Sequence, residues 1–415
     1  MPLAFGPASL RWCWPDVVWY SLIYCEAHNA LVQGVVVSIF LTFKIIMSHT
    51  LGALSDHELK ALLAGGYITG ASSEHISPAS LDLTLSEEVY EINGLLLPKA
   101  GERVADTLSL MEATPTSLEQ PLRAGQMYLV RLQESLALPS HIYGYCNPKS
   151  STGRLDTHVR VLADGVPRYD SITPKGYSGE LWLAVYPQSF SLQVHVGTAL
   201  TQLRLFTADT RLSEAELADF LSSDQLLWHE TSDQPIAHAD LRTHDQDGAL
   251  LLTAHISSGV VGYQCIAEPA SIIDVARVGQ YDSDAYFAPI YAEDGVIRLK
   301  RDQFYILSGA ERVRIPPTLA SEMVPMDERS GDFRSHYAGF LDPGWGWGQD
   351  GSGTGRPFTL EVRPFEDLVI RAGQPIAKIR FERMSQAPEV HYDNKASNYL
   401  AQAGPKLAKQ FKVST

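Results

Sequence analysis

The order of hydrophobic and polar positions predicts a chain built mainly from short β-strands. After residue 80, hydrophobic and polar residues alternate in short runs such as LDLTL (81–85) and TQLRLF (201–206). A period of two places successive side chains on opposite faces of a strand. Gly, Pro and Asn interrupt the runs about every 8–12 residues, which is typical of an all-β barrel or sandwich. The pattern resumes from about Leu250.

Two segments depart from this alternation and predict helices. In residues 55–64, Ser55 or Asp56 can cap a helix whose leucines lie at helical spacing. The segment SEAELADFLSSDQLLWHE (213–230) predicts a second helix, which we place in a polar linker.

The two strand-rich regions repeat the same order of features. Each runs from a strand through a polar turn to a strand that ends at proline, and then to a polar cluster that closes on an arginine, Arg154 or Arg334. A turn rich in glycine and aromatic residues and a final strand follow in both. We therefore predict a tandem duplication of one β-barrel or jelly-roll unit, spanning 47–208 and 246–415, with the helical linker at 209–245.

The first 46 residues differ from the rest. Residues 30–47 are nearly apolar, but Gln33 and Lys44 interrupt them and no small-residue cleavage motif follows. We interpret 1–46 as an extension that arises from the choice of gene start, with a signal anchor as the alternative. An amphipathic helix start follows Met47.

Composition limits the possible functions. The chain has 415 residues, 45% of them hydrophobic, and a formal net charge of −15. This excludes broad nucleic-acid binding, which needs a basic face, and we expect no membrane partner. Neither a Cys-x-x-Cys pair nor a disulfide framework is indicated, so we expect a reducing, cytoplasmic compartment. The four cysteines are Cys13, Cys25, Cys146 and Cys265.

One compact group of hydrogen-bond donors stands out in this acidic chain, in NPKSSTGR (147–154). Hydroxyls, cations and a glycine amide converging on one turn can hold a triphosphate. On its own the segment also fits a solvated turn with surface charges. The candidate ligands are Lys149, Ser150, Ser151, Gly153 and Arg154.

Four motifs, in order, resemble the deoxycytidine triphosphate (dCTP) deaminase branch of the trimeric dUTPase-like fold. The resemblance covers residues 48–415 and is similar to long bacterial members in which two units are fused. It implies hydrolytic deamination of dCTP to dUTP and ammonia, no metal at the base, Mg²⁺ bound with the triphosphate, and a homo-oligomer. The motifs are SPASLDLTL (77–85), KSSTGR (149–154), LDPGWGWG (341–348) followed by TLEV (359–362), and HYDNKASNYLAQAG (391–404).

The resemblance assigns the essential base to Glu361, whereas the first copy has Ala184 at that position. A carboxylate beside C4 of cytosine can take a proton from the attacking water and return one to the leaving amine. Alternation alone leaves Glu361 on a face that is either solvent or pocket. The phosphate motif of the second copy is poorer, because Asp332 would repel a triphosphate. Its candidate ligands are Arg329, Ser330 and Arg334.

The resemblance implies further substrate contacts around the base, the sugar and the C-terminal segment. Asp342 also fits an Asp-Pro-Gly turn that needs no ligand. Asn398 stands where the family usually has lysine. The implied contacts come from Ala338, Asp342, Thr359, Tyr392 and Gln402.

The segment 391–415 predicts a mobile lid, because its small and polar residues bury little apolar surface. Such a lid would exclude water and bring lysines to the phosphates. A loose basic tail is the alternative. The lysines are Lys406, Lys409 and Lys412.

Two other functions stay open on the sequence. A dUTP pyrophosphatase, alone or combined with the deaminase, needs an Asp near the α-phosphate, and Asp164 with Tyr177–Gly179 resembles a remnant of such a turn. A nucleotide-binding regulator without catalysis is the other. The sequence also leaves open whether the site lies in the second copy alone or is shared between the copies.

Overall fold

The described residues of 50–415 belong to one compact unit. The predicted N-terminal extension lies outside the described residues. In the part of the chain that is described, no helix is long and apolar enough to cross a membrane. The computed structural model describes residues 51–241, 247–257, 259–268, 270–326, 339–395 and 402–412, and the backbone of 335–336.

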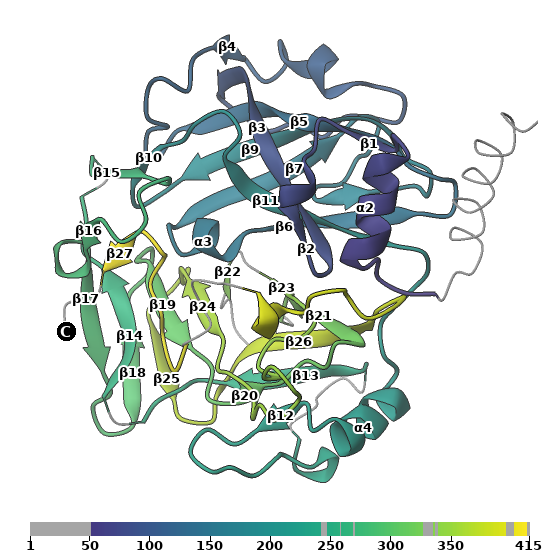
Figure 1. The fold of residues 1–415 in the computed structure, drawn as a ribbon. Helices are drawn as coiled ribbons and strands as arrows, with labels where there is room; N and C mark the ends of the chain where they lie inside the picture. Colours follow the sequence, from purple (N-terminus) through teal and green to yellow (C-terminus); the bar gives the residue numbers. More distant parts are fainter. Residues whose placement is uncertain are drawn as a thin grey trace, which may run out of the picture. The chain divides into compact units, whose positions relative to one another are not determined.

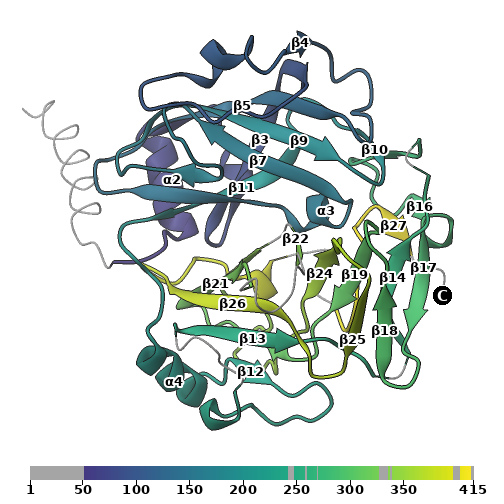
Figure 2. The same ribbon diagram turned by 180° about the vertical axis from the view of Figure 1, so that it is seen from behind.

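The first copy is a single antiparallel sheet of ten strands (Figures 1 and 2). Seven strands follow the order β7-β9-β5-β3-β11-β6-β8, and β1, β2 and β4 pair beside them. Helices α2 (Asp56–Ala64) and α3 (Ser150–Gly153) accompany the sheet. The strands are β1 (Ile68–Thr69), β2 (Ile76–Ser77), β3 (Ser80–Ile92), β4 (Thr114–Pro115), β5 (Met127–Ala137), β6 (Tyr143–Pro148), β7 (Thr157–Ala163), β8 (Ser171–Ile172), β9 (Ser178–Pro187) and β11 (Ala199–Phe206).

The second copy divides its strands between two main sheets, ordered β13-β26-β21-β23 and β17-β14-β19-β24-β22. Helix α4 (Glu214–Ser223) precedes them. The strands are β13 (Ala249–Thr253), β14 (Val260–Cys265), β17 (Phe287–Tyr291), β19 (Tyr305–Ser308), β21 (Leu319–Val324), β22 (Ser335–His336), β23 (Phe340–Leu341), β24 (Thr359–Val362) and β26 (Pro375–Arg383).

Short two-stranded sheets complete the fold. Two of them are parallel and join the copies or the C-terminal segment to the body of the protein. The pairs are β10 (Ser191–Gln193) with β15 (Ile272–Asp274), β12 (Leu227–Trp228) with β20 (Arg312–Val313), β16 (Tyr281–Asp282) with β27 (Phe411–Lys412), and β18 (Val296–Leu299) with β25 (Leu368–Arg371).

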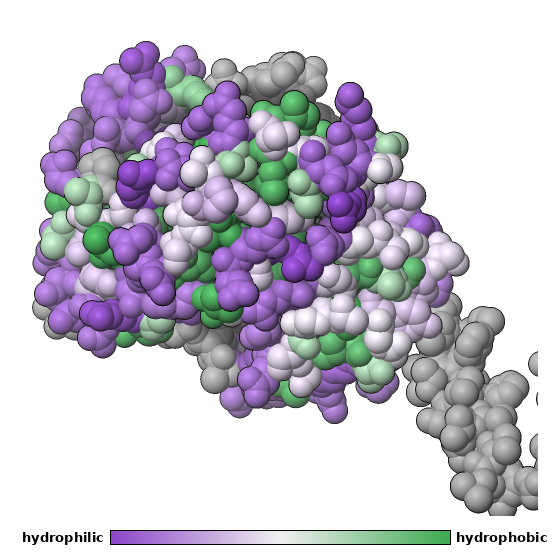
Figure 3. Space-filling model, turned by 90° about the horizontal axis from the view of Figure 1, so that it is seen from above, coloured by the Kyte–Doolittle hydropathy of each residue, from purple (hydrophilic) through white to green (hydrophobic). Residues whose placement is uncertain are grey.

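The mainly β prediction is confirmed, and the burial of β9 explains why some strands do not alternate. Residues 181–185 are all buried, because both faces of this strand are covered. Leu183 and its like-facing neighbours join one hydrophobic cluster, while Trp182 and Ala184 join another. The outer surface seen in Figure 3 is mostly hydrophilic, with hydrophobic residues scattered over it, as expected for a chain with a buried core.

Matching contacts in the two copies support the duplication. The Tyr128 hydroxyl accepts a hydrogen bond from the Arg123 amide at 3.0 Å, and the Tyr305 hydroxyl accepts one from the Lys300 amide at 2.7 Å. Both tyrosines stand at the same place, on β5 and β19. A buried hydroxyl needs such a partner, so both copies keep the same solution.

Helix α4 corresponds to helix α2 and therefore opens the second copy, which differs from its predicted place in a linker. Both helices begin with a capping box, Ser55 with Glu58 and Ser213 with Glu216. Each is followed by a two-residue strand, β1 or β12, that pairs with a strand of its own copy.

A buried arginine joins the two copies. Arg204, on β11, has no exposed surface (0%) and donates to the Glu382 carboxylate at 3.0 Å and to the Ser321 carbonyl at 3.1 Å. Both partners belong to the second copy. Removing one side of a buried, hydrogen-bonded ion pair costs about 3–5 kcal/mol. Arg204 therefore fixes the first-copy sheet against strands β21 and β26.

Candidate active site

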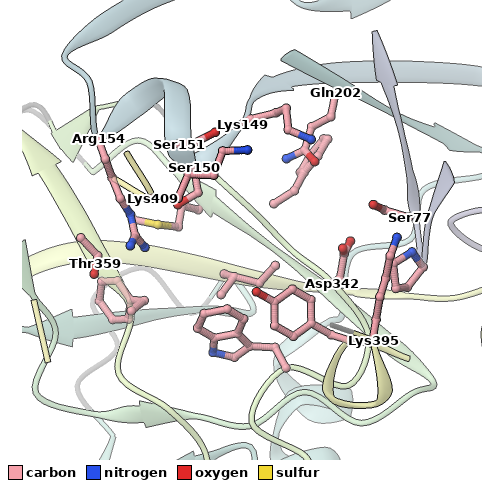
Figure 4. Close-up of a pocket in the computed structure, with 17 residues that line it drawn as sticks. Ser77, Lys149, Ser150, Ser151, Arg154, Gln202, Asp342, Thr359, Lys395 and Lys409 are labelled. Carbon is pink, nitrogen blue, oxygen red and sulfur yellow. The ribbon is translucent and has the colours of Figure 1, made fainter. Parts of the chain in front are cut away.

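A cavity of about 270 Å³ lies between the two copies (Figure 4). Both copies supply its walls, with the phosphate-motif residues on one side and residues of the second copy on the other. The lining residues are Ser77, Pro78, Lys149, Ser150, Ser151, Arg154 and Gln202 from the first copy, and Met323, Phe340, Leu341, Asp342, Trp345, Phe358, Thr359, Tyr392, Lys395 and Lys409 from the second.

The predicted phosphate motif forms the one-turn helix α3, which we call the phosphate turn (149–154). Lys149, Ser150 and Ser151 face the cavity. Thr152 anchors the turn, because its hydroxyl donates to the Leu200 carbonyl at 2.8 Å. The Gly153 amide was expected to approach a phosphate, but it donates to the Lys149 carbonyl at 3.2 Å within the turn.

Arg154 closes the phosphate turn and meets Glu361 of the second copy. The distance from Arg154 Nε to Glu361 Oε1 is 3.5 Å, and the two side chains are only 3% and 1% exposed. Arg154 Nη1 donates to the Lys406 carbonyl at 3.0 Å, and Nη2 to Gln402 Oε1 at 3.2 Å. One guanidinium thus joins the phosphate turn, the candidate base and the C-terminal segment.

Glu361 does not lie on a solvent face. All four residues of β24 are buried, and Leu360 and Val362 pack in the hydrophobic core of the second copy. Thr359 lines the cavity, and its hydroxyl accepts a hydrogen bond from the Lys406 amide at 3.3 Å. The alternation that sequence left open is therefore resolved in favour of burial.

Asp342 lies on the opposite wall from the phosphate turn (Figure 4). Its Oδ1 is 3.6 Å from Nη2 of Arg204. Burial raises the pKa of the Asp342 carboxyl, and the Arg204 guanidinium opposes that rise. Arg204 also lies over the Phe340 ring, 4.1 Å from its centre, and donates to the Leu341 carbonyl at 3.3 Å. Arg204 of the first copy thus contacts the residues that form this wall of the cavity.

Two family models match the chain over most of its length. The N-terminal domain of 2'-deoxycytidine 5'-triphosphate deaminase matches residues 50–209, and the C-terminal domain matches residues 216–411. This chain belongs to the dCTP deaminase family. The predicted reaction, hydrolytic deamination of dCTP to dUTP and ammonia, is thereby confirmed.

A solved structure agrees with this assignment. The crystal structure of 2'-deoxycytidine 5'-triphosphate deaminase from Agrobacterium tumefaciens is 34% identical, with a TM-score of 0.74. The match covers 82% of this chain and 97% of the other. A search of the curated proteins finds no match.

Within this dCTP deaminase fold, the register of two strand pairs supports the assigned correspondence between Glu361 and Ala184. In the second copy Glu361 is opposite Ile306, which follows Tyr305; in the first, Ala184 is opposite Leu129, which follows Tyr128. Ala184 packs among apolar side chains of the first copy. At this position the first copy has a side chain of its hydrophobic core, whereas the second copy has a carboxylate.

The C-terminal segment, predicted to be a mobile lid, buries several apolar residues over the part that the structure describes. Leu407, Ala408 and Phe411 are buried in a hydrophobic cluster to which both copies contribute, and the Phe411 ring lies 5.1 Å from Phe287. These contacts pack 402–412 against the protein in this state, and its mobility without ligand stays a prediction. Gln402 is buried, and its amide donates to the Pro357 carbonyl at 2.8 Å.

The predicted lysines of this segment take different places. Lys409 lines the cavity, where burial lowers the pKa of its ammonium and the charge of Lys149 adds to this. Lys406 contributes its backbone to the Arg154 and Thr359 contacts. Lys412 lies at the surface, paired with Asp282 at 3.1 Å.

Tyr392 lines the cavity, and contacts with Trp345 and Pro343 fix its position. Its ring centre is 5.0 Å from that of Trp345, and its amide donates to the Pro343 carbonyl at 2.8 Å. The next residue, Asp393, binds the Gly348 amide at 2.8 Å and the Arg356 guanidinium at 2.5 Å. The start of the C-terminal segment is thus fixed to the glycine-rich loop.

Several predicted ligands lie outside the described residues, and the sequence did not indicate some of the residues that lie at or near the cavity. Asp82 pairs with Lys149, and its place in the first resemblance motif could have indicated it. Gln202 and Met323 carried no signal, because each occupies an ordinary strand position. Lys395 lies within the C-terminal motif, and its ammonium donates to the Ile76 carbonyl at 3.2 Å. The residues outside the described ranges are Arg329, Ser330, Arg334, Ala338 and Asn398.

The predicted remnant of a pyrophosphatase turn has a structural role. Asp164 accepts hydrogen bonds from the Val104 amide at 2.8 Å and the Glu180 amide at 3.1 Å. The Tyr177 hydroxyl donates to the Glu180 carbonyl at 2.7 Å. These groups fold the turn and are not among the residues that line the cavity.

Proposed function

We propose that dCTP is deaminated in the cavity between the two copies, with the phosphate turn of the first copy and Glu361 of the second in one site. The observation that carries this proposal is the 3.5 Å distance from Arg154 Nε to Glu361 Oε1. The first copy has no carboxylate at the matching position, Ala184, and the second has a poorer phosphate motif. Each copy thus supplies what the other lacks.

Glu361 is the proposed general acid and base. It accepts a proton from water as the oxygen attacks C4 of cytosine. It then delivers a proton to the exocyclic nitrogen as the C4–N bond breaks. The sum is water plus dCTP giving dUTP plus ammonia. Arg154 orients the carboxylate, and burial of both side chains keeps bulk water away from it.

The phosphate turn is the proposed triphosphate site. Ser150 and Ser151 supply hydroxyls, and Lys149 and Lys409 supply charge, all on the cavity wall. These cations give the cavity a local charge opposite to the net charge of −15. Holding all three phosphates favours a nucleoside triphosphate over a nucleoside.

Mg²⁺ is proposed to enter with the phosphates. Among the described residues no group of three or more His, Cys, Asp or Glu side chains is placed to hold a metal ion. Asp342 on the cavity wall lies against Arg204, and Asp82, which does not line the cavity, pairs with Lys149. The residues therefore fit a metal bound mainly through phosphate oxygens, where it would neutralise charge.

Product analysis tests the proposed site. Purified protein is incubated with dCTP and Mg²⁺, and ammonia, dUTP and pyrophosphate are measured separately. We expect equal amounts of ammonia and dUTP from the wild type. Pyrophosphate as well would indicate a bifunctional enzyme, and a chain that binds dCTP without turnover would indicate a regulator. Unchanged turnover in both Arg154→Ala and Glu361→Gln would contradict the shared site.

A homo-oligomer in the cytoplasm is the proposed setting. Units of the resembled fold assemble in threes, whereas one chain supplies two, so completing a trimer-like arrangement requires further copies. The thiols Cys146 and Cys265 are buried and free, which suits a reducing compartment. Light scattering after size exclusion tests the assembly, and a monomeric mass for active protein would contradict it.

A further inference from the structure

Asn147 lies on β6 directly before the phosphate turn and does not line the cavity. Its side chain nevertheless crosses to the second copy. The Gly339 amide donates to Asn147 Oδ1 at 2.7 Å, and the side chain of Asn147 also hydrogen-bonds the Glu322 carboxylate. One carboxamide therefore contacts two segments of the other copy, strand β21 at Glu322 and the residue before β23, Gly339.

Both partners of Asn147 are adjacent to residues of the cavity wall. Gly339 precedes Phe340, and Glu322 precedes Met323, and both of these followers line the cavity. The two partners are also joined to each other, because the Met323 amide donates to the Gly339 carbonyl at 2.7 Å. Asn147 thus holds a compact piece of backbone that continues into Asp342.

The contact is close enough to require glycine. A Cβ at position 339 would lie 2.7 Å from Asn147 Nδ2 and 3.1 Å from the Met323 carbonyl oxygen. Such separations are shorter than ordinary van der Waals contact. A larger residue at 339 would have to displace either the Asn147 carboxamide or the part of the cavity wall formed by Met323, Phe340 and Asp342, which we call the base-side wall.

The strand register gives the second copy no counterpart of the Asn147 side chain. Asn147 is opposite Gln202 on β11, and the matching pair in the second copy is Val324 opposite Lys378 on β26. Valine has no hydrogen-bonding side chain. Asn147 is therefore a difference between the copies, like Glu361 and Ala184.

We propose that Asn147 is a positioning residue that sets the separation between the phosphate turn and the base-side wall, and so determines how the nucleoside end of dCTP is held. The proposal rests on the proposed function. dCTP must span both ends of the cavity, and Asn147 is attached to the turn by its backbone and to the wall by its side chain. A misplacement of about 1 Å in a catalytic site can cost about 10²-fold in rate.

The first test separates the two ends of the ligand. In Asn147→Ala and Gly339→Ala we expect dUTP to inhibit at least tenfold more weakly. Inorganic tripolyphosphate, which needs only the phosphate turn, should inhibit within about threefold of wild type. kcat for dCTP should fall in parallel with dUTP affinity. Asn93→Ala is the matched control, because Asn93 also belongs to the first copy and donates to a glutamate, Glu112, at 2.7 Å, but at the exposed surface.

The second test exchanges donor and acceptor. Asn147→Asp keeps the oxygen that accepts from Gly339 but loses the donor to Glu322 and sets two carboxyls side by side. Adding Glu322→Gln supplies an amide donor in place of the lost one. We expect the single variant to lose at least tenfold in kcat/KM and the double variant to regain most of it. A role in folding stability alone would change the amount of folded protein and leave kcat/KM of the folded protein unchanged.

The outcomes decide between a positioning role and its alternatives. Equal weakening of dUTP and tripolyphosphate, or unchanged binding of both in Asn147→Ala, would overturn the proposal. So would a double variant no better than Asn147→Asp. If Asn147→Ala does not fold, the double variant still decides. Failure of the proposed function would instead appear as wild-type protein that does not deaminate dCTP, or as active Glu361→Gln.

Discussion

The strand pair β5–β9 of the first copy and the pair β19–β24 of the second have the same register but opposite chemistry. Leu129 and Ala184 face each other in the first, and Ile306 and Glu361 in the second. In the first copy this position is filled by a hydrophobic cluster around Trp182. In the second it receives Arg154 from the other copy. Under the proposed function, the first copy holds the triphosphate and the second copy keeps the reactive group.

The largest effect is expected from Glu361→Gln. The amide keeps the shape of the side chain but cannot act as a base, so kcat should fall by about 10²–10⁴-fold. Binding of dUTP should stay within a few-fold of wild type, because the proposed phosphate ligands are untouched. Ammonia release and isothermal titration measure the two. Turnover within tenfold of wild type would remove Glu361 from the mechanism.

Arg154→Ala removes the side chain that the first copy places beside Glu361. It leaves the Glu361 carboxylate, the Gln402 side chain and the Lys406 carbonyl without the guanidinium that joins them. Each charge-assisted hydrogen bond is worth about 1.5–3 kcal/mol. We therefore expect both kcat and the free energy of unfolding to fall. The substitution should weaken the binding of dCTP more than it weakens the binding of deoxycytidine.

Arg154→Lys is the matched variant for this prediction. Lysine keeps the charge but lacks the fork that reaches several partners at once. It should recover less than a tenth of the lost activity. If Arg154→Ala binds dCTP normally and keeps its kcat, the working phosphate site must belong to the second copy instead.

Ala184→Glu tests whether the first copy can regain a site. The new carboxylate would lie among apolar side chains such as Trp182 and Leu162, and the cation opposite it in the strand register, Arg160, is already paired with Asp170. Burying a charge without a partner is strongly unfavourable, so we expect a loss of about 3 kcal/mol or more in unfolding free energy. Urea denaturation measures it. Combined with Glu361→Gln, the variant should restore no activity; a stable and active double variant would contradict the comparison.

Much of this comparison could be predicted from the sequence. The order of motifs indicated a duplicated β fold, and it placed Glu361 and Ala184 at matching positions, in agreement with the register. These features are local, because a strand's alternation and a turn's composition depend on near neighbours. The phosphate turn could be found for the same reason.

The remainder depends on contacts between distant segments. Nothing near Arg154 indicates that it meets Glu361, because that distance is set by how one copy packs on the other. Phe411 is an isolated aromatic residue in a polar segment, so its burial beside Phe287 was not predictable. Helix α4 was predicted as a helix but placed in a linker, because its matching element, α2, lies at the other end of the first copy.

The smallest effect concerns a second difference between the copies. Strand register places Tyr145 opposite Arg204 in the first copy and Glu322 opposite Arg380 in the second. Tyr145 packs on Phe206 with ring centres 5.9 Å apart, whereas Glu322 lies in an ionic group with Glu382 and Arg204. An acid in this place should make the joint between the copies sensitive to pH.

Burial raises the pKa of Glu322 from 4.5 to about 7, and the Glu382 charge adds to the rise. The folded chain therefore binds a proton that the unfolded chain releases between these pH values. This contribution to stability is complete below about pH 4.5 and is lost as pH rises through about 7. Glu322→Gln removes the dependence, so the variant should be more stable than wild type at pH 8, by about 1–2 kcal/mol after allowing for partial exposure.

The pH dependence of that gain is what identifies its cause, and thermal melting between pH 4.5 and 8 measures it. The difference between Glu322→Gln and wild type should shrink as pH falls and vanish near pH 4.5. Glu216→Gln is a control of opposite sign, because hydrogen bonds from Ser213 lower the pKa of Glu216 to about 2. That variant should be less stable than wild type at neutral pH, and the deficit should close toward pH 2. A gain in Glu322→Gln that does not change with pH would instead reflect packing, and the ionic difference between the copies would then have no part in their stability.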